Sequence, residues 1–284
     1  MTRMKRVIIC LIAMALPILA NGQGAASLLI PTDSRSLAMG GVFIQPEAAT
    51  MDAGASYGIW APGTAANNVV AADVFFRIGD KLALTFEGKD FIDKPYVISG
   101  DQGSSRGTFT PNELILSLGA YYYITDALSA GIKLKSVNSD IAETAKGSAF
   151  CGDVEVTYGG SNWSATLAGR NIGTKINYSG AAYSLPAYVA AGGQWSPIAN
   201  LKVAAEADYL FSGAVMAGAG AEYCIADIAF VRAGYHYGDA AKALPSFASL
   251  GLGAKYAGIS LDAGMILLSE TIGNSFLIRL GYAF

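Results

Sequence analysis

Charged side chains recur at alternate positions in this sequence, in segments whose intervening residues are apolar. Lys133 and Lys135, for example, alternate with Ile132 and Leu134. Because the side chains of a strand point alternately to its two faces, such a segment has one apolar and one charged face. Charges placed this way can pair with one another or bind a polar or ionised ligand. The polar residues that we assign to the charged faces are Lys81, Glu87, Lys89, Lys133, Lys135, Asp153, Glu155, Arg170, Lys202, Glu206, Asp208, Arg232, His236, Lys255, Asp262 and Arg279.

The direction of these charges follows from their cost in lipid. An Arg or Lys on the lipid-facing side of a membrane sheet costs ~2–4 kcal/mol near mid-bilayer. If the apolar faces contact lipid, the charged faces must therefore line a lumen. Both signs of charge alternate around that wall, which leaves two interpretations. The charges can pair and close the lumen, or they can border a polar passage or a ligand site.

Residues for catalysis or metal binding are sparse. His236 is the single histidine and falls on the same strand face as Arg232, so it is best interpreted as part of the lumen wall. One histidine in a strand gives no Ser-His-Asp arrangement, and Cys151 and Cys224 lack the spacing of metal ligands. We therefore expect no enzyme activity, no metal and no cofactor. Whether the two cysteines pair is left open by their spacing.

The alternating pattern recurs over most of the chain and predicts an all-β protein. Weaker segments at Leu37–Ile44 and Gly54–Trp60 would raise about twelve strands to fourteen, and bacterial barrels use even numbers. We expect an antiparallel up-and-down transmembrane barrel of about fourteen strands, with twelve as the alternative. The long interruption from Phe91 to Asn112 predicts a surface loop or an inward-folded one.

Composition separates the barrel from other apolar folds. Apolar residues make up 52% of the chain and charged residues 14%, yet no stretch after Gln23 has eighteen uninterrupted apolar residues. This excludes a helical membrane protein. A soluble sandwich would also alternate, but its outward face would be rich in long charged residues, whereas here many of those positions are Gly, Ala or Ser. Aromatic residues such as Tyr158 and Tyr256 gather at strand ends, as in membrane girdles.

The last strand of the sequence resembles the carboxy-terminal insertion signal of Gram-negative outer-membrane barrels. One face carries Phe276, Ile278, Leu280, Tyr282 and the terminal Phe284, and the other carries Arg279. The resemblance implies insertion by the barrel-insertion machinery, with the apolar face toward outer-membrane lipid.

The first residues indicate export. Arg3, Lys5 and Arg6 precede a short apolar core, and small residues stand before Gln23, which predicts a signal peptide over 1–22 and a barrel domain over 23–284. Cleavage would move the formal net charge from −3 to −6, because those three cations leave with the leader. This balance excludes a strongly basic nucleic-acid binder, and we expect no nucleic acid among the partners.

Four segments together resemble the PorV/PorQ family within the broader FadL-like class of outer-membrane barrels. They are Ser34–Phe43, similar to an Arg-x-x-x-Met-Gly-Gly strand; Ile59–Ala65, similar to a Trp-Asn-Pro-Ala-Gly turn, with Ala61 in place of Asn; Arg170–Gly173 followed by Leu185-Pro186; and Val231–Tyr235. The resemblance implies fourteen strands and an amino-terminal segment partly in the lumen.

The same resemblance implies two functions. PorV-like members assist type IX protein secretion, which makes an accessory or cargo-docking role in export the first expectation, with secretion components or exported proteins as partners. FadL-like members pass hydrophobic small molecules, which makes a small transporter or channel the alternative. A structural barrel that scaffolds a partner is a further one. The identity of the cargo or solute and the oligomeric state are not predicted.

Overall fold

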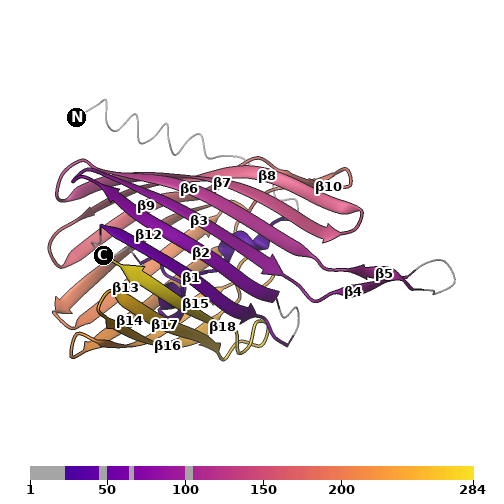
Figure 1. The fold of residues 1–284 in the computed structure, drawn as a ribbon. Helices are drawn as coiled ribbons and strands as arrows, with labels where there is room; N and C mark the ends of the chain where they lie inside the picture. Colours follow the sequence, from indigo (N-terminus) through magenta and orange to yellow (C-terminus); the bar gives the residue numbers. More distant parts are fainter. Residues whose placement is uncertain (1–22, 45–49, 64–66, 100–104) are drawn as a thin grey trace.

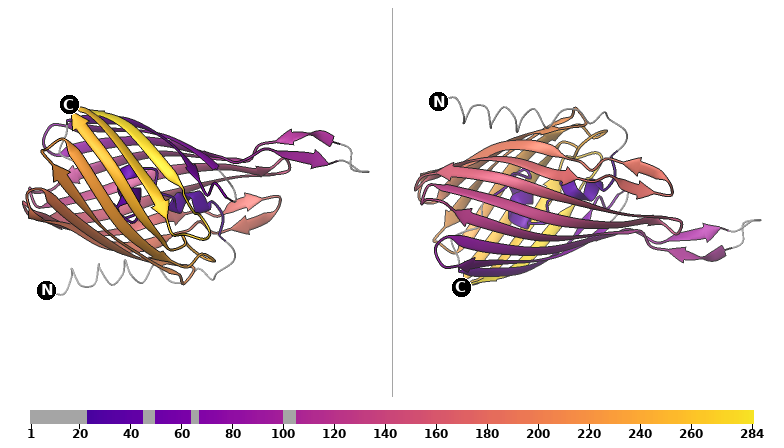
Figure 2. Two further views of the ribbon diagram at one scale, coloured as in Figure 1. Left: turned by 90° about the horizontal axis from the view of Figure 1, so that it is seen from below. Right: turned by 90° about the horizontal axis from the view of Figure 1, so that it is seen from above.

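The chain forms a closed barrel of antiparallel strands (Figures 1 and 2). The computed structural model describes residues 23–44, 50–63, 67–99 and 105–284, and within them the barrel has fourteen strands. The all-β prediction and the strand count are thus confirmed. In spatial order the strands are β1 (Met51–Trp60), β2 (Asn67–Ile78), β3 (Leu82–Ile92), β6 (Asn112–Tyr123), β7 (Leu128–Ala142), β8 (Ala145–Gly159), β9 (Trp163–Gly173), β12 (Tyr188–Ile198), β13 (Leu201–Leu210), β14 (Val215–Ile225), β15 (Ala229–Gly238), β16 (Phe247–Tyr256), β17 (Ile259–Leu267) and β18 (Phe276–Ala283).

The two ends of the barrel differ in their connections. At one end, which we call the turn end, short turns join the strands. Ala257 and Gly258 between β16 and β17 have φ of 50° and 83°, the left-handed pair that a tight two-residue hairpin requires. Phe284 also lies there, and its carbonyl accepts a hydrogen bond from the Met51 N–H at 3.0 Å. The opposite end, which we call the loop end, carries the longer connections.

Two hairpins extend the loop end. β4 (Tyr96–Ser99) and β5 (Ser105–Phe109) interrupt the path from β3 to β6 and project away from the barrel (Figure 1). The predicted break from Phe91 to Asn112 therefore contains an outward hairpin whose two strands form a sheet of their own. β10 (Ile176–Tyr178) and β11 (Ala181–Tyr183) form the second hairpin, in which Ile176 is fully buried.

The outer face of the barrel is an apolar belt. Large side chains of the strands point outward, and Leu134 and Leu252 are each 66% exposed. The residues Ile278, Leu280, Tyr282 and Phe284 share this face, while Arg279 points inward. A belt of this kind is what a lipid-facing barrel presents. Among the described residues no helix has the length and hydropathy needed to cross a membrane.

The amino-terminal residues 23–44, which we call the lumen segment, lie inside the barrel (Figure 2). The segment starts at the loop end, where the Gly24 N–H donates to the Ser184 carbonyl at 3.0 Å. It then forms a 3₁₀ turn, η1 (Ala26–Leu29), and a short helix, α2 (Ser34–Ala38), which packs on β15 to β18. The predicted leader over 1–22 falls outside the described residues, as do Thr64 and Ala65 of the second motif.

The prediction of a strand at Leu37–Ile44 is wrong. Leu37 and Ala38 end helix α2, and the chain then turns at Gly40 and Gly41, whose φ values are 80° and 75°. The apolar side chains of this stretch are buried against the barrel wall instead of alternating between two faces. The count of fourteen still holds, because the rest of the chain after Val69 supplies one strand more than its pattern indicates.

The interior of the barrel has two chemically different halves. Toward the loop end, apolar side chains such as Leu28, Trp60, Phe91 and Phe247 form the main hydrophobic cluster. Toward the turn end, the inward residues are largely charged. The lumen segment crosses both halves, and its apolar residues Leu28 and Leu29 belong to the first.

Candidate functional site

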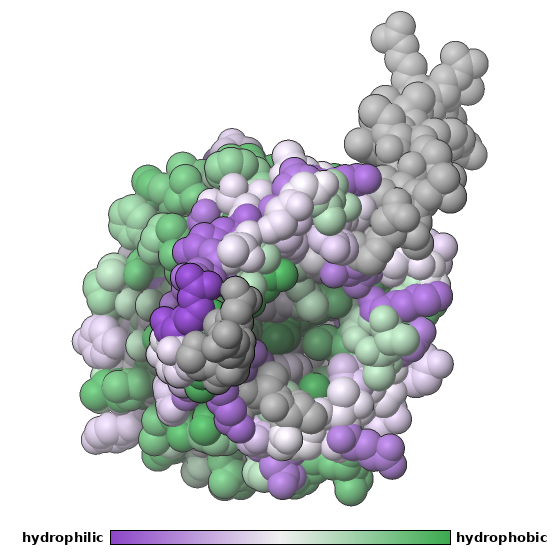
Figure 3. Space-filling view, turned by 90° about the vertical axis from the view of Figure 1, so that its right-hand side faces the viewer, coloured by the Kyte–Doolittle hydropathy of each residue, from purple (hydrophilic) through white to green (hydrophobic). Residues whose placement is uncertain are grey.

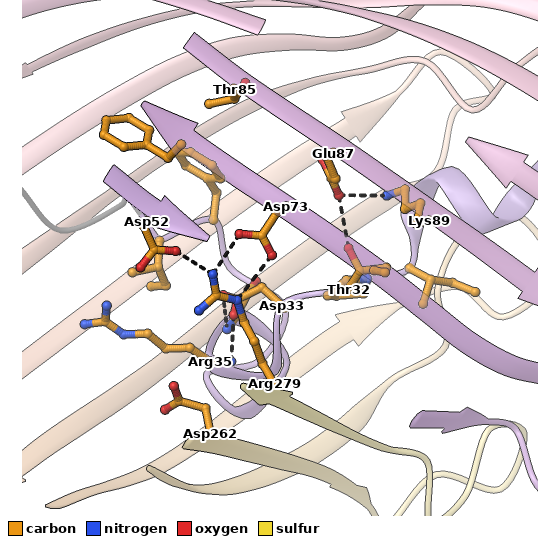
Figure 4. A pocket seen from close by; sticks show the side chains of 18 of the residues that line it. Thr32, Asp33, Arg35, Asp52, Asp73, Thr85, Glu87, Lys89, Asp262 and Arg279 are labelled. Carbon is orange, nitrogen blue, oxygen red and sulfur yellow. Dashed lines mark hydrogen bonds and ion pairs between the residues drawn. The ribbon is translucent and has the colours of Figure 1, made fainter. Parts of the chain in front are cut away.

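A cavity of about 450 Å³ lies between the lumen segment and the barrel wall. Thr32 and Arg35 of the lumen segment border it, and Asp52, Glu87 and Arg279 do so from the wall (Figure 4). The cavity reaches the turn between β16 and β17, since Gly258 also lines it. The remaining sequence-predicted residues that line it are Lys89, Lys133, Lys135, Asp153, Arg170, Glu206, Arg232, Lys255 and Asp262.

Arg279 fastens the seam at which the barrel closes. Its Nη2 donates to Asp52 of β1 at 2.5 Å and to Asp73 of β2 at 2.7 Å, and its Nε donates to Asp73 at 3.2 Å (Figure 4). β18 pairs with β1 along this seam. One largely buried guanidinium thus connects the last strand of the barrel to the first two.

A second network holds the lumen segment to the wall. The Nε and Nη2 of Arg35 donate to the two carboxylate oxygens of Glu222 at 2.7 and 2.6 Å. The same carboxylate accepts from Arg232 Nε at 2.6 Å, and Arg232 Nη1 donates to Asp262 at 2.6 Å. The charges alternate along the chain of four residues, so each is compensated in a site where an unpaired charge would be costly.

A third group of charges lies on β3, β7 and β8. Glu87 is 3.3 Å from Lys133 Nζ and 3.8 Å from Lys89 Nζ, and it accepts a hydrogen bond from Thr32 at 3.1 Å. Next to it, Lys135 Nζ lies 2.7 Å from Asp153. These side chains meet because the strands place them on the inner face at neighbouring heights.

A bulge in β9 positions Asp153 and Lys135. Arg170 and Asn171 together oppose Asp153 of β8, and Asn171 has a φ of 55°. Its N–H donates to Asp153 at 2.8 Å, its side-chain oxygen accepts from Lys135 at 2.8 Å, and its side-chain nitrogen donates to the Pro186 carbonyl at 3.2 Å. The third motif therefore has two parts that meet in the structure. Arg170–Gly173 contains the bulge, and Leu185-Pro186 is the segment to which Asn171 of the bulge is hydrogen-bonded.

Arg170 and the acidic residues of β13 complete the wall. The Arg170 guanidinium lies 4.6 Å from the centroid of the Phe43 ring and 3.9 Å from Glu155. Glu206 and Asp208 are two residues apart on β13, so they share its inner face. Asp208 is buried and does not line the cavity.

Five predicted residues do not line this cavity, namely Lys81, Glu155, Lys202, Asp208 and His236. Lys81 is in the exposed turn between β2 and β3, so the placement of its side chain on the lumen wall is wrong. Lys202 and Lys255 lie near the turn-end termini of β13 and β16. His236 is buried, stacks on Phe247 with ring centroids 4.9 Å apart and has its Nδ1 3.2 Å from the Gly40 carbonyl.

Sequence reasoning missed several charged residues of the site, namely Asp33, Arg35, Asp52, Asp73 and Glu222. The alternation of apolar and charged residues is weak on β1 and β14. Gly and Ala occupy most positions there, so the two faces of each strand differ little. Asp33 accepts hydrogen bonds from the backbone N–H groups of Arg35 and Ser36 and so caps α2. Burial raises the pKa of the Asp33 carboxyl, although the Ser36 hydrogen bond lowers it.

The two cysteines of the described chain are free. Cys151 lies opposite Gly173 near the loop end, whereas Cys224 lies near the turn end of β14. Their positions at opposite ends of the barrel answer the question that the sequence left open.

Comparisons with known proteins place the fold. No family model and no curated protein matches the chain. Among solved structures, the toluene transporter TbuX of Ralstonia pickettii has a TM-score of 0.59 at 14% identity, over 88% of this chain and 98% of that one. The CymD monoaromatic hydrocarbon channel has 0.58 at 15% identity, over 90% and 98%. A FadL homologue of Pseudomonas aeruginosa has 0.52 at 12% identity, over 95% and 100%.

The fold is therefore that of the FadL-like outer-membrane β-barrels, with fourteen strands and a short amino-terminal helix. Of the three similar structures, one is described as a transporter and one as a channel. None of these three structures is described as a PorV or PorQ protein.

Proposed function

We propose that this chain is an outer-membrane channel for small hydrophobic or amphipathic solutes. The observation that carries the proposal is the two-part lumen. Toward the loop end the interior is apolar, and in the view onto that end an apolar hollow lies within a largely hydrophilic rim (Figure 3). Beyond the apolar half, a charged cavity of about 450 Å³ continues toward the turn end.

The orientation follows from the connections. Outer-membrane barrels have short periplasmic turns and longer extracellular loops, so the loop end would face outward and the turn end the periplasm. A solute with apolar surface would enter at the hollow, where burial of that surface is favourable by about 25 cal/mol per Å². It would then pass the lumen segment to reach the charged cavity. The predicted signal peptide over 1–22 would deliver the chain to this membrane.

The similar structures support the same direction. TbuX is described as a toluene transporter and CymD as a monoaromatic hydrocarbon channel. At 14% and 15% sequence identity, these two structures support a shared fold. The apolar hollow of this chain is the feature that suggests a solute chemically related to theirs.

Whole-cell uptake tests the proposal. A Gram-negative strain that lacks its own aromatic channels would express the full-length chain, and the uptake of dilute toluene and benzyl alcohol would be measured against that of glucose. We expect faster uptake of the two aromatic solutes with no change for glucose. Equal uptake in expressing and non-expressing cells, with the barrel present in the outer membrane, would rule out the channel.

The export-accessory function is a second candidate, and the β4–β5 hairpin is the feature that favours it. This hairpin projects from the loop end, where a docking element would have to be exposed, and its Val97 is 58% exposed. Affinity capture from solubilised outer membranes would test it with the wild-type chain and with a chain whose residues 96–109 are replaced by a short turn. Recovery of the same proteins, or of none, by both chains would exclude docking through the hairpin.

A further inference from the structure

Three lysines from two strands converge on the cavity. Lys89 comes from β3, and Lys133 and Lys135 come from β7, with β6 between these strands. The residues of β6 that lie between them are small. Ser117 pairs with both Glu87 and Lys135, and Gly119 pairs with both Thr85 and Lys133. A Cβ on Gly119 would lie 2.4 Å from the Thr85 hydroxyl. The small residues on β6 therefore let long side chains from β3 and β7 meet above it.

The lysines are unequally engaged by carboxylates. Lys135 Nζ contacts Asp153 at 2.7 Å and the Asn171 side-chain oxygen at 2.8 Å, which are ordinary hydrogen-bond distances. Lys133 Nζ is 3.3 Å from Glu87, and Lys89 Nζ is 3.8 Å from the same carboxylate. At 3.8 Å there is no hydrogen bond.

Glu87 therefore serves two ammonium groups at once. It also accepts a hydrogen bond from Thr32 of the lumen segment. Each ammonium carries three N–H donors and no acceptor, so one shared carboxylate leaves donors on Lys89 and Lys133 that a further acceptor can use. Two other nearby carboxylates have contacts of their own: Glu155 faces Arg170 at 3.9 Å, and Glu113 accepts from the Ser27 hydroxyl.

The surroundings favour a ligand with both an anionic and an apolar part. The side chains of Lys89 and Lys133 are only 10% and 21% exposed, so an anion beside them is poorly screened by salt. The same cavity is lined by Leu28 and Leu29, which belong to the apolar cluster. Ammonium donors and an apolar surface thus border one space of about 450 Å³.

We propose that Lys89 and Lys133 bind the carboxylate of a small amphipathic organic acid, whose apolar body contacts Leu28 and Leu29. The inference rests on the proposed channel function and narrows its solute. A neutral hydrocarbon offers no acceptor to these donors, whereas a carboxylate forms charge-assisted hydrogen bonds with them. The acid leaves through the charged cavity toward the turn end. A hydrocarbon on the same path would lose its contacts with apolar side chains and gain no polar contacts in their place.

Calorimetric binding to the purified full mature barrel in detergent tests this site with benzoate, benzyl alcohol and acetate. These probes separate the carboxylate from the apolar ring. We expect benzoate to bind at least tenfold more tightly than either of the others. Lys89→Met and Lys133→Met should each weaken benzoate binding about tenfold and leave benzyl alcohol unchanged. Lys81→Met, on the exposed turn between β2 and β3, is the matched control and should bind like the wild type.

Three outcomes would overturn the proposal. The first is that benzoate and benzyl alcohol bind equally well. The second is that both lysine variants bind benzoate like the wild type. The third is that acetate and inorganic phosphate bind as tightly as benzoate. The heat-dependent gel shift of each variant shows that the barrel is folded. Flux of neutral benzyl alcohol in liposomes reports the channel itself, so a failed anion site and a failed channel give different results.

Discussion

Gly234 of β15 lies directly against the backbone of Gly40 in the lumen segment. A Cβ on Gly234 would be 2.2 Å from the Gly40 nitrogen. Neighbouring strands repeat the relationship, because a Cβ on Gly220 would be 2.5 Å from the Met39 carbonyl oxygen and one on Gly264 would be 2.5 Å from that of Ser34. The glycines of β14, β15 and β17 thus let the backbone of the lumen segment pack directly against the backbone of these strands.

The first prediction concerns this packing of the lumen segment against the glycines of the wall. Gly234→Ala places a methyl group where only a hydrogen fits, and overpacking of this kind costs about 1–3 kcal/mol. We expect the lumen segment to move away from the barrel wall, so that planar-bilayer conductance rises and thermal stability falls. Gly63→Ala is the control, since a Cβ there meets nothing within 4 Å. Unchanged conductance and stability in Gly234→Ala would show that the segment is not seated on the glycines.

The second prediction concerns Glu222, which binds both Arg35 and Arg232. Glu222→Gln removes the charge of the carboxylate that Arg35 and the buried Arg232 share, and breaking a buried pair costs about 3–5 kcal/mol. We expect faster hydrogen exchange in residues 33–42 and a lower unfolding temperature. Asp140→Asn removes the exposed pair with Lys146 and should cost less than about 1 kcal/mol. Equal effects of the two substitutions would contradict the role of Glu222.

The third prediction concerns pH. Burial raises the pKa of Asp33 above its ordinary value of 3.8. A group with a raised folded-state pKa stabilises the fold below its unfolded pKa, and this contribution is lost as pH rises through the folded pKa. We expect the lumen segment to resist proteolysis better as the pH falls toward the ordinary carboxyl range. Asp33→Asn keeps a capping side chain and does not ionise, so it should weaken this dependence. An identical pH profile in the variant would refute the role of Asp33.

The fourth prediction concerns the outer belt. Leu252→Arg places a cation on the lipid-facing side of β16, at a cost of ~2–4 kcal/mol near mid-bilayer. We expect the free energy of unfolding, measured in lipid vesicles, to fall by that amount. Leu268→Arg is the control, because Leu268 is 90% exposed in the connection after β17 and lies outside the strands. An equal loss in both variants would argue against a lipid-facing belt.

Period-two alternation made the barrel predictable from the sequence. Leu134 and Lys135 show why, because lipid and lumen place opposite demands on neighbouring residues. The pattern of Leu37–Ile44 does not predict the lumen segment, because a segment inside a barrel is surrounded by protein and need not alternate. Its determinants are distant glycines such as Gly234, and no local pattern connects these to Gly40. Likewise Glu222 is recognised as part of the site only once folding brings Arg35 to β14.

Two of the motifs gain their meaning in the same way. Arg35 and Gly40 belong to the first motif, and Arg232 and Gly234 belong to the fourth. In the folded chain the arginines share Glu222 and the glycines touch. The motifs thus describe the two sides of one contact between the lumen segment and the wall, a relation that their separation in the sequence conceals.

The most direct test of a solute channel is flux through the purified barrel in liposomes. The entry of benzyl alcohol and of glucose would be followed in vesicles with the wild-type chain, with Gly234→Ala and with no protein. The structure predicts that the wild type accelerates benzyl alcohol and excludes glucose, and that Gly234→Ala admits both. A wild-type barrel that is folded and inserted yet passes benzyl alcohol no faster than bare lipid would contradict the channel.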